Sequence, residues 1–159
     1  MVEDARFEDG GERPLSLKAL DAEDLTVISA LVQDAVVPVG EMSYDANKRR
    51  FAMLLNRFRW EDVEAAQARG RAVERVQTVL LFDDVIKARS MGVDGRDTET
   101  IVSVLALTFE AGPDGTGRVE ITLAGDGAIA LDVETIDATL KDVTRPYVAP
   151  SHKVPTHDA

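Results

Sequence analysis

The stretch Arg49–Glu61, which reads RRFAMLLNRFRWE, constrains the fold of this chain more than any other stretch. In a β-strand, successive side chains point to opposite faces of the sheet. Met53 and Leu55 then lie on one face, and Ala52 and Leu54 lie on the other. Apolar residues on both faces are typical of a central strand that is covered on two sides. We therefore expect a β-rich core with this strand at its centre, buried on both faces.

The far end of the same stretch changes from apolar to cationic and aromatic. An arginine side chain can hold a carboxylate or a phosphate through two hydrogen bonds, and it can also stack on a ring. The candidates for ligand or partner binding are the polar and aromatic residues at this end, Asn56, Arg57, Arg59 and Trp60. A purely structural role is the alternative. In that case the arginines form ion pairs within the fold, with Asp83 and Asp84 as the partners, and the tryptophan closes the core.

Length and charge limit the classes of function. The chain has 159 residues, a usual length for a single domain, and a formal net charge of −11. Binding to polyanions depends on lysine and arginine contacts, so this charge argues against a nucleic-acid or membrane-surface binder. Because the chain has no cysteine, disulfides, thiolate catalysis and cysteine-ligated metals are excluded.

No secretory signal or membrane span is recognisable in the sequence. The acidic N-terminus lacks an apolar segment, and no run approaches the roughly 18 apolar residues of a spanning helix. We expect a soluble, cytoplasmic protein with one domain over residues 14–148 and disordered tails at 1–13 and 149–159. Both histidines, His152 and His157, lie in the second tail, where disorder is favoured over a metal site, and no cofactor is expected.

The clearest helical pattern follows Asp21. This residue is a candidate N-cap, and Glu23 and Asp24 in the first turn complement the helix dipole. The apolar residues that recur along one face are Leu25, Ile28, Leu31, Val32 and Ala35. Pro38 disfavours helical geometry at the residue before it, so we expect the helix to end near Ala35. Such a stripe usually packs onto a sheet, and a partner-binding surface is the alternative.

The rest of the chain has the pattern of successive short strands. We predict strands over residues 15–20, 36–44, 76–82, 85–91, 101–109, 118–123 and 129–133. Residues 61–70 are either a surface loop or a short helix. For Ile136–Val143, a strand continued through a bulge is favoured over a helix because several side chains are β-branched. The predicted fold class is α+β: mostly antiparallel β, about eight short strands in a barrel or two packed sheets, with one N-terminal amphipathic helix.

Four segments resemble a known family. They are DAEDLTVISALVQDAV (21–36), RRFAMLLNRFRWE (49–61), LLFDDVIKARSMGV (80–93) and AIALDVETIDATLKDV (128–143). In this order they are similar to the uncharacterised alphaproteobacterial family called domain of unknown function 2948. The resemblance covers nearly the whole chain between the tails. It implies a soluble bacterial protein, and it brings no reaction, cofactor or catalytic residue.

The sequence contains no catalytic signature. Without a core histidine or a cysteine, the usual nucleophilic sites have no base. A carboxylate pair built from Asp83 and Asp84 with Glu61 and Asp62 is conceivable, but neighbouring side chains on a strand point to opposite faces. No catalytic or metal-binding residue is therefore assigned, and the sequence leaves open whether the chain is an enzyme.

Two hypotheses follow for function. The first is a non-catalytic cytoplasmic binding or assembly module that holds a protein partner with the end of the Arg49–Glu61 strand or with the helix. The alternative is a small-molecule or anion-binding protein, an enzyme included, centred on Asn56, Arg57 and Arg59. A concave pocket that receives the arginines favours the alternative, whereas arginines that pair internally favour the module. The oligomeric state is not indicated.

Overall fold

The computed structural model describes residues 14–93 and 95–148, and there the protein is an α+β fold built on one open antiparallel sheet. The predicted tails, with His152 and His157, lie outside the described residues. The strands are β1 Ser16–Ala19, β2 Val36–Pro38, β3 Met42–Asp45, β4 Arg50–Phe58, β5 Glu74–Phe82, β6 Val85–Met91, β7 Ile101–Ala111, β8 Gly117–Leu123, β9 Ala128–Val133, β10 Ala138–Asp142 and β11 Tyr147–Val148. The helices are α2 Ala22–Val32 and α3 Val63–Ala68.

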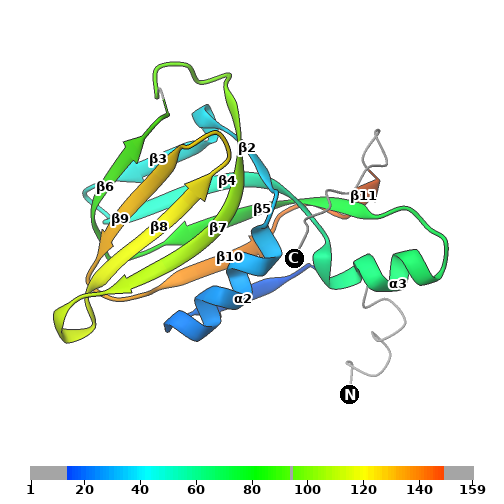
Figure 1. The fold of residues 1–159 in the computed structure, drawn as a ribbon, viewed down its shortest axis with the longest axis horizontal. Coiled ribbons are helices and arrows are strands. Elements are labelled where there is room, and N and C mark those ends of the chain that lie inside the picture. Colours follow the sequence, from blue (N-terminus) through cyan, green and yellow to red (C-terminus); the bar gives the residue numbers. More distant parts are fainter. Residues whose placement is uncertain (1–13, 94, 149–159) are drawn as a thin grey trace.

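The short strand β2 divides the sheet into two layers. The strand order is β1-β10-β5-β4-β2-β7-β8-β9-β6, with β3 beside β4 and β11 beside β5. β2 pairs with β4 at one position, Val36 opposite Asn56, and with β7 along its whole length. The first layer holds β1, β10, β5, β4, β3 and β11, and the second holds β7, β8, β9 and β6 (Figure 1). The sheet stays open, so of the two predicted arrangements the barrel is wrong.

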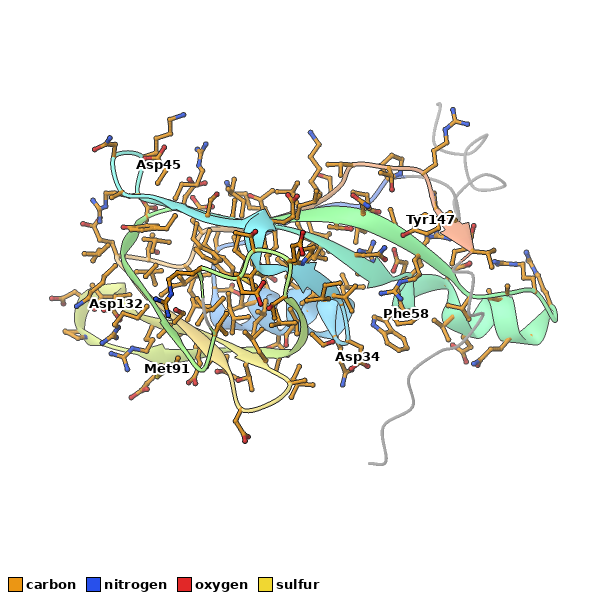
Figure 2. The ribbon with its side chains drawn as sticks, turned by 90° about the horizontal axis from the view of Figure 1, so that it is seen from above. Asp34, Asp45, Phe58, Met91, Asp132 and Tyr147 are labelled. Carbon is orange, nitrogen blue, oxygen red and sulfur yellow. The ribbon has the colours of Figure 1, made fainter. Side chains whose placement is uncertain are left out.

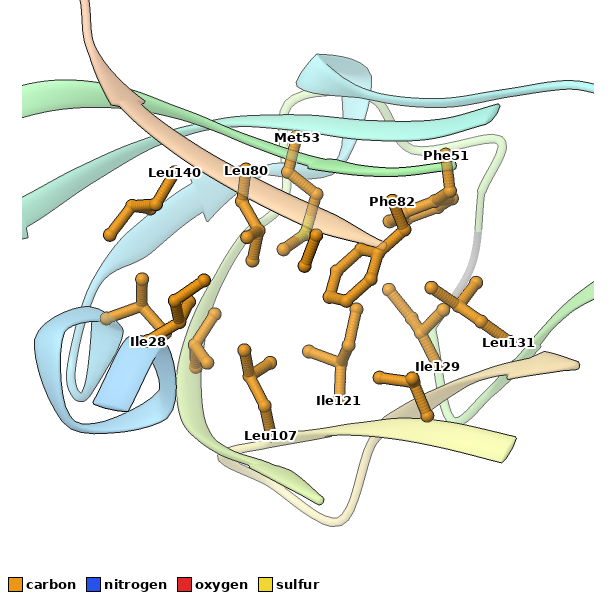
Figure 3. Close-up of a cluster of buried hydrophobic side chains, with 14 of the residues drawn as sticks. Ile28, Phe51, Met53, Leu80, Phe82, Leu107, Ile121, Ile129, Leu131 and Leu140 are labelled. Carbon is orange, nitrogen blue, oxygen red and sulfur yellow. The ribbon is translucent and has the colours of Figure 1, made fainter. Parts of the chain in front are cut away.

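The core lies between these layers. Met53, Leu80 and Phe82 project from the first layer toward Leu107 and Ile121 of the second (Figure 3). Helix α2 packs at one end of this space, where Ile28 completes the cluster. The alternating apolar residues of β8, Val119, Ile121 and Leu123, are buried in the same core.

Helix α2 begins as the sequence predicts and ends earlier. The Asp21 carboxylate accepts a hydrogen bond from the Asp24 backbone N–H at 2.8 Å, which caps the helix. The predicted stripe faces the core, with Leu31 half-buried and the other members buried. The helix stops at Val32 rather than near Ala35, because Asp34 adopts a left-handed conformation and donates its N–H to the Val104 carbonyl of β7.

Three further segments differ from the prediction. Residues 36–44 form two strands, β2 and β3, separated by a 3₁₀ turn at Val39–Glu41 whose first two N–H groups bond to the segment before β7. Residues 61–70 contain the short helix α3, one of the two forms considered. Ile136–Val143 is not a bulged continuation of β9: β10 is a separate strand that crosses to the first layer and pairs with β5 and β1.

The prediction that the central strand is buried on both faces is wrong. On the inner face of β4, Phe51, Met53 and Leu55 are buried. On the opposite face, Ala52 and Leu54 are only half-buried. α2 lies on the inner side of the layer and therefore does not cover them (Figure 3). The sequence predicts two apolar faces correctly, but the described chain covers only one.

Candidate functional site

Arg57 is neutralised inside the fold by two carboxylates. Its side chain is 0% exposed. Nη1 and Nη2 donate to the two Glu61 carboxylate oxygens at 2.8 and 2.9 Å, and Nη2 donates to Asp142 at 3.0 Å. Nε donates to the Thr78 hydroxyl at 3.1 Å. The guanidinium is therefore saturated by partners of the same chain, and it is closed to an outside anion.

Asp142 connects four elements through this cluster. Its carboxylate accepts hydrogen bonds from Arg57 of β4, from the Thr78 hydroxyl of β5 at 2.8 Å and from the Leu15 N–H before β1 at 2.8 Å. Asp142 itself lies at the end of β10 and is 3% exposed. A buried charge pair with all its hydrogen-bonding groups satisfied fixes the geometry of the strands that supply it.

The charges in this cluster shift one another's titration. Burial by itself raises the pKa of Glu61, but the hydrogen bonds and the positive charge of Arg57 outweigh it, and the pKa is lowered. Burial by itself lowers the pKa of Arg57, but the hydrogen bonds and negative charges of Glu61 and Asp142 outweigh it, and the pKa is raised. Both groups thus stay charged at neutral pH, which supports a structural role.

Arg59 and Trp60 are also held by the fold. Arg59 is 3% exposed and donates to the Glu74 carboxylate at 2.6 Å. Asp62 lies between Arg59 and Arg71, and its hydrogen bond with Arg71 lowers the pKa of its carboxyl. The Trp60 indole N–H donates to the Gln33 carbonyl beyond α2 at 2.9 Å. These contacts fix the connection between β4 and β5.

The two aspartates predicted to pair with Arg57 do not contact it. Asp83 accepts a hydrogen bond from Arg50 at 2.8 Å, at the opposite end of β4. Asp84 adopts a left-handed turn conformation, and its carbonyl accepts from the Glu134 N–H. β4 and β5 are antiparallel neighbours, so the end of β5 lies beside the start of β4 and far from Arg57. Arg57 does form ion pairs within the fold, but its partners are Glu61 and Asp142, so the predicted partners Asp83 and Asp84 are wrong.

Arg75 is the arginine that the sequence reasoning missed. Its guanidinium stacks on the Phe58 ring, 4.3 Å from the centroid. Nε donates to the Asn56 side-chain oxygen at 2.7 Å, and Nη2 donates to the Asn56 carbonyl at 3.1 Å. The Asn56 amide nitrogen donates in turn to the Tyr147 hydroxyl. Asn56 is thus a positioning residue for Arg75, and Phe58 and Tyr147 lie at this same end of the molecule (Figure 2).

Arg75 contacts no described carboxylate, whereas seven other arginines do. Those that contact one are Arg49, Arg50, Arg57, Arg59, Arg71, Arg89 and Arg118. No described carboxylate contacts Arg75, and its Nη1 group donates to no described atom. Burial lowers the pKa of Arg75, and the electrostatic interaction with Tyr147 partly counteracts this decrease. One feature of the sequence could have drawn attention to Arg75: it directly precedes Val76, the first of the alternating apolar residues of β5.

Arg75 lies at the end of a ladder of cross-strand pairs. Ala52 is opposite Leu81, and Leu54 is opposite Val79. Asn56 opposite Gln77 and Phe58 opposite Arg75 continue the series. Directly opposed residues of antiparallel strands point to the same side of the sheet. The outer side of β4 and β5 therefore runs from an apolar part to a polar, cationic end.

We call the outward positions of β1, β10, β5 and β4 the outer face. They are Ser16, Lys18, Thr139, Lys141, Arg75, Gln77, Val79, Leu81, Arg50, Ala52, Leu54, Asn56 and Phe58. None of these positions holds an acidic residue, although the chain has 29 aspartates and glutamates against 18 lysines and arginines. Two of the four cations on the outer face, Lys18 and Arg50, pair with Asp137 and Asp83 at the edge of the face. The outward cations without a described carboxylate are Lys141 and Arg75.

A separate cleft lies between the edges of β3 and β6. It has a volume of about 220 Å³ and is lined mainly by apolar side chains such as Met42, Tyr44, Phe51 and Ile129. The Tyr44 hydroxyl donates a hydrogen bond to the Val85 carbonyl at 2.7 Å. None of the predicted site residues lines this cleft.

The described residues contain no cluster of metal-ligating side chains. Glu61, Asp62 and Asp83 each contact a different arginine, so the carboxylate pair considered from the sequence does not form. Within the same residues, no helix has the length and apolar character needed to span a membrane.

Comparison with known proteins identifies the family of this chain. The model of the family described as "Protein of unknown function (DUF2948)" matches residues 15–157. The chain belongs to the DUF2948 family. No curated protein and no solved structure matches it. The resemblance proposed from the four segments is confirmed at the level of the family, and the DUF2948 match extends beyond the described strands.

Proposed function

We propose that this DUF2948 protein is a non-catalytic binding module that holds a protein partner on the outer face. The supporting observation is the half-buried apolar ladder of β4 and β5, formed by Ala52, Leu54, Val79 and Leu81. Solvated sheet faces usually alternate with polar residues, whereas these outward positions are apolar. An apolar surface bordered by polar residues is typical of protein interaction sites.

The alternative, an anion-binding protein centred on Asn56, Arg57 and Arg59, receives less support. Both arginines are buried and paired with carboxylates of the same chain. Asn56 is occupied by Arg75 and Tyr147. An anion would have to displace these partners, and a buried carboxylate left without its cation is strongly unfavourable.

We also propose that the module works in the cytoplasm of a bacterium. The cytoplasm is supported by the lack of cysteine and by the acidic composition. Assignment to alphaproteobacteria is supported by the resemblance of the four segments given above.

Site-specific photo-crosslinking tests the binding proposal. A photoreactive amino acid replaces Val79 on the outer face, and a matched control replaces Ile86, which is exposed on β6 of the second layer. Irradiation in the native cell is expected to give a discrete heavier adduct from position 79 that is absent from position 86. An adduct with a second copy of the chain, an adduct from position 86 alone, or no adduct would overturn the proposal.

A further inference from the structure

Resting on the proposed function, we infer that the partner binds through an acidic segment and that Arg75 holds one of its carboxylates. The inference names the chemistry of the partner, and it depends on three features of the outer face. These are the open guanidinium of Arg75, its fixed orientation and the distribution of charge around it.

The orientation of Arg75 is set before any ligand binds. The Phe58 ring supports the flat side of the guanidinium, and Asn56 holds Nε and Nη2. This arrangement leaves the Nη1 group available. An arginine whose rotamer is already fixed loses less conformational entropy on binding, so its hydrogen bonds to a ligand are stronger in net terms.

The charge of the outer face selects an acidic partner. Lys141 and Arg75 contact no described carboxylate, whereas Lys18 and Arg50 are already neutralised by Asp137 and Asp83 at the edge of the face. The chain as a whole is strongly acidic, with a net charge of −11. An acidic segment is therefore attracted to this face and repelled by other surfaces, which favours one orientation of binding.

A carboxylate fits the site better than a phosphate group. Phosphate sites usually combine several cations and backbone N–H groups, whereas Arg75 is the one cation among the described outward positions at this end of β4 and β5. The single negative charge of a carboxylate matches one arginine, which holds it through charge-assisted hydrogen bonds. The spacing adds a constraint: Arg75 and Val79 are four residues apart on β5, about 13 Å in an extended strand. The partner would then place its carboxylate about that distance from the apolar side chain that packs on Val79.

Nuclear magnetic resonance of the arginine Nε–H groups tests this directly in the full chain. The probes are 3-phenylpropionate, its neutral amide 3-phenylpropanamide, inorganic phosphate and a decathymidylate oligonucleotide. We expect the carboxylate to shift the Arg75 Nε–H signal saturably and to leave Arg118, which already contacts Asp132, unchanged. Arg75→Gln should weaken binding at least about tenfold, as expected for the loss of a hydrogen bond between charged groups.

The opposing outcomes are equally defined. An equal response to the neutral amide, a larger response to phosphate or to the oligonucleotide, or no response would overturn the inference. Crosslinking from position 79 in the Arg75→Gln background separates the two proposals. An undiminished adduct contradicts the role of Arg75 and leaves the binding module intact, whereas no adduct even with Arg75 present contradicts the module itself. A cooperative thermal transition of Arg75→Gln shows that the fold is retained.

Discussion

Arg57 and Arg75 lie one register step apart on neighbouring strands, yet their surroundings are opposite. Arg57 projects inward from β4 and meets Glu61, Asp142 and Thr78. Arg75 lies outward on β5 and meets an aromatic ring and an amide, with no described carboxylate. The difference shows that residue type alone does not decide the role of a cation. The face of the sheet decides it, because inward cations must be neutralised to be buried.

The largest effect is expected from removing the inner arginine. Arg57→Ala leaves Asp142 buried without its cation and should destabilise the protein by about 3–5 kcal/mol. Urea denaturation monitored by circular dichroism measures this change. The control is Arg71→Ala, which removes an exposed arginine from a carboxylate in the neighbouring connection. A loss for Arg57→Ala no larger than for the control would show that the inner cluster is not structural.

A double-mutant cycle tests whether the inner cluster acts as a unit. Arg57→Ala and Asp142→Ala should be coupled by on the order of 1–3 kcal/mol, because they share a buried hydrogen-bond network. The matched cycle on the outer face combines Arg75→Gln with Lys141→Gln, which no described contact joins. That cycle should be additive. Coupling of similar size in both cycles would erase the distinction between the two faces.

Acid should weaken the ion pairs that Glu61 and Asp62 form with arginines. Arg57 lowers the pKa of Glu61, and Arg71 lowers that of Asp62. Carboxyls whose pKa is lower in the folded state add stability above the unfolded pKa, about 4, and this stability is lost as the pH falls through the folded values. Denaturation midpoints between pH 7 and pH 3 measure the loss. In Glu61→Gln the fall should be shallower, and an unchanged slope would exclude Glu61 as a contributor.

The smallest effect on stability is expected from the outer arginine. Arg75→Gln breaks no ion pair among described residues. It removes a cation–π contact and two hydrogen bonds to Asn56, so its cost should be about 1–2 kcal/mol. Thermal melts of Arg75→Gln and of Arg57→Gln compare the two positions, because the same substitution is made at each. A loss at Arg75 as large as at Arg57 would mean that Arg75 is itself a structural cation.

The helix and the strands were largely predictable because their signals are local. Asp21 and the stripe around Ile28 predicted α2, and the alternation of apolar residues predicted β4, β5 and β7. The end of the helix was not predictable, since Asp34 turns to bond with Val104, far away in the sequence. Arg57 and Trp60 were predicted as candidate binding residues, and the structure places both in contacts within the fold that neighbouring residues do not indicate.

The sequence by itself determined strands β4, β5 and β7, the helix cap and the presence of two apolar faces on β4, because each follows from backbone periodicity and short-range hydrogen bonding. Only the tertiary structure decided which face was covered and which carboxylate met which arginine. Asp142 lies 85 residues from Arg57 and joins it only because β10 crosses to the first layer beside β5. Arg75 became the open cation for the same reason: its register places it outward, where the described fold supplies no acid.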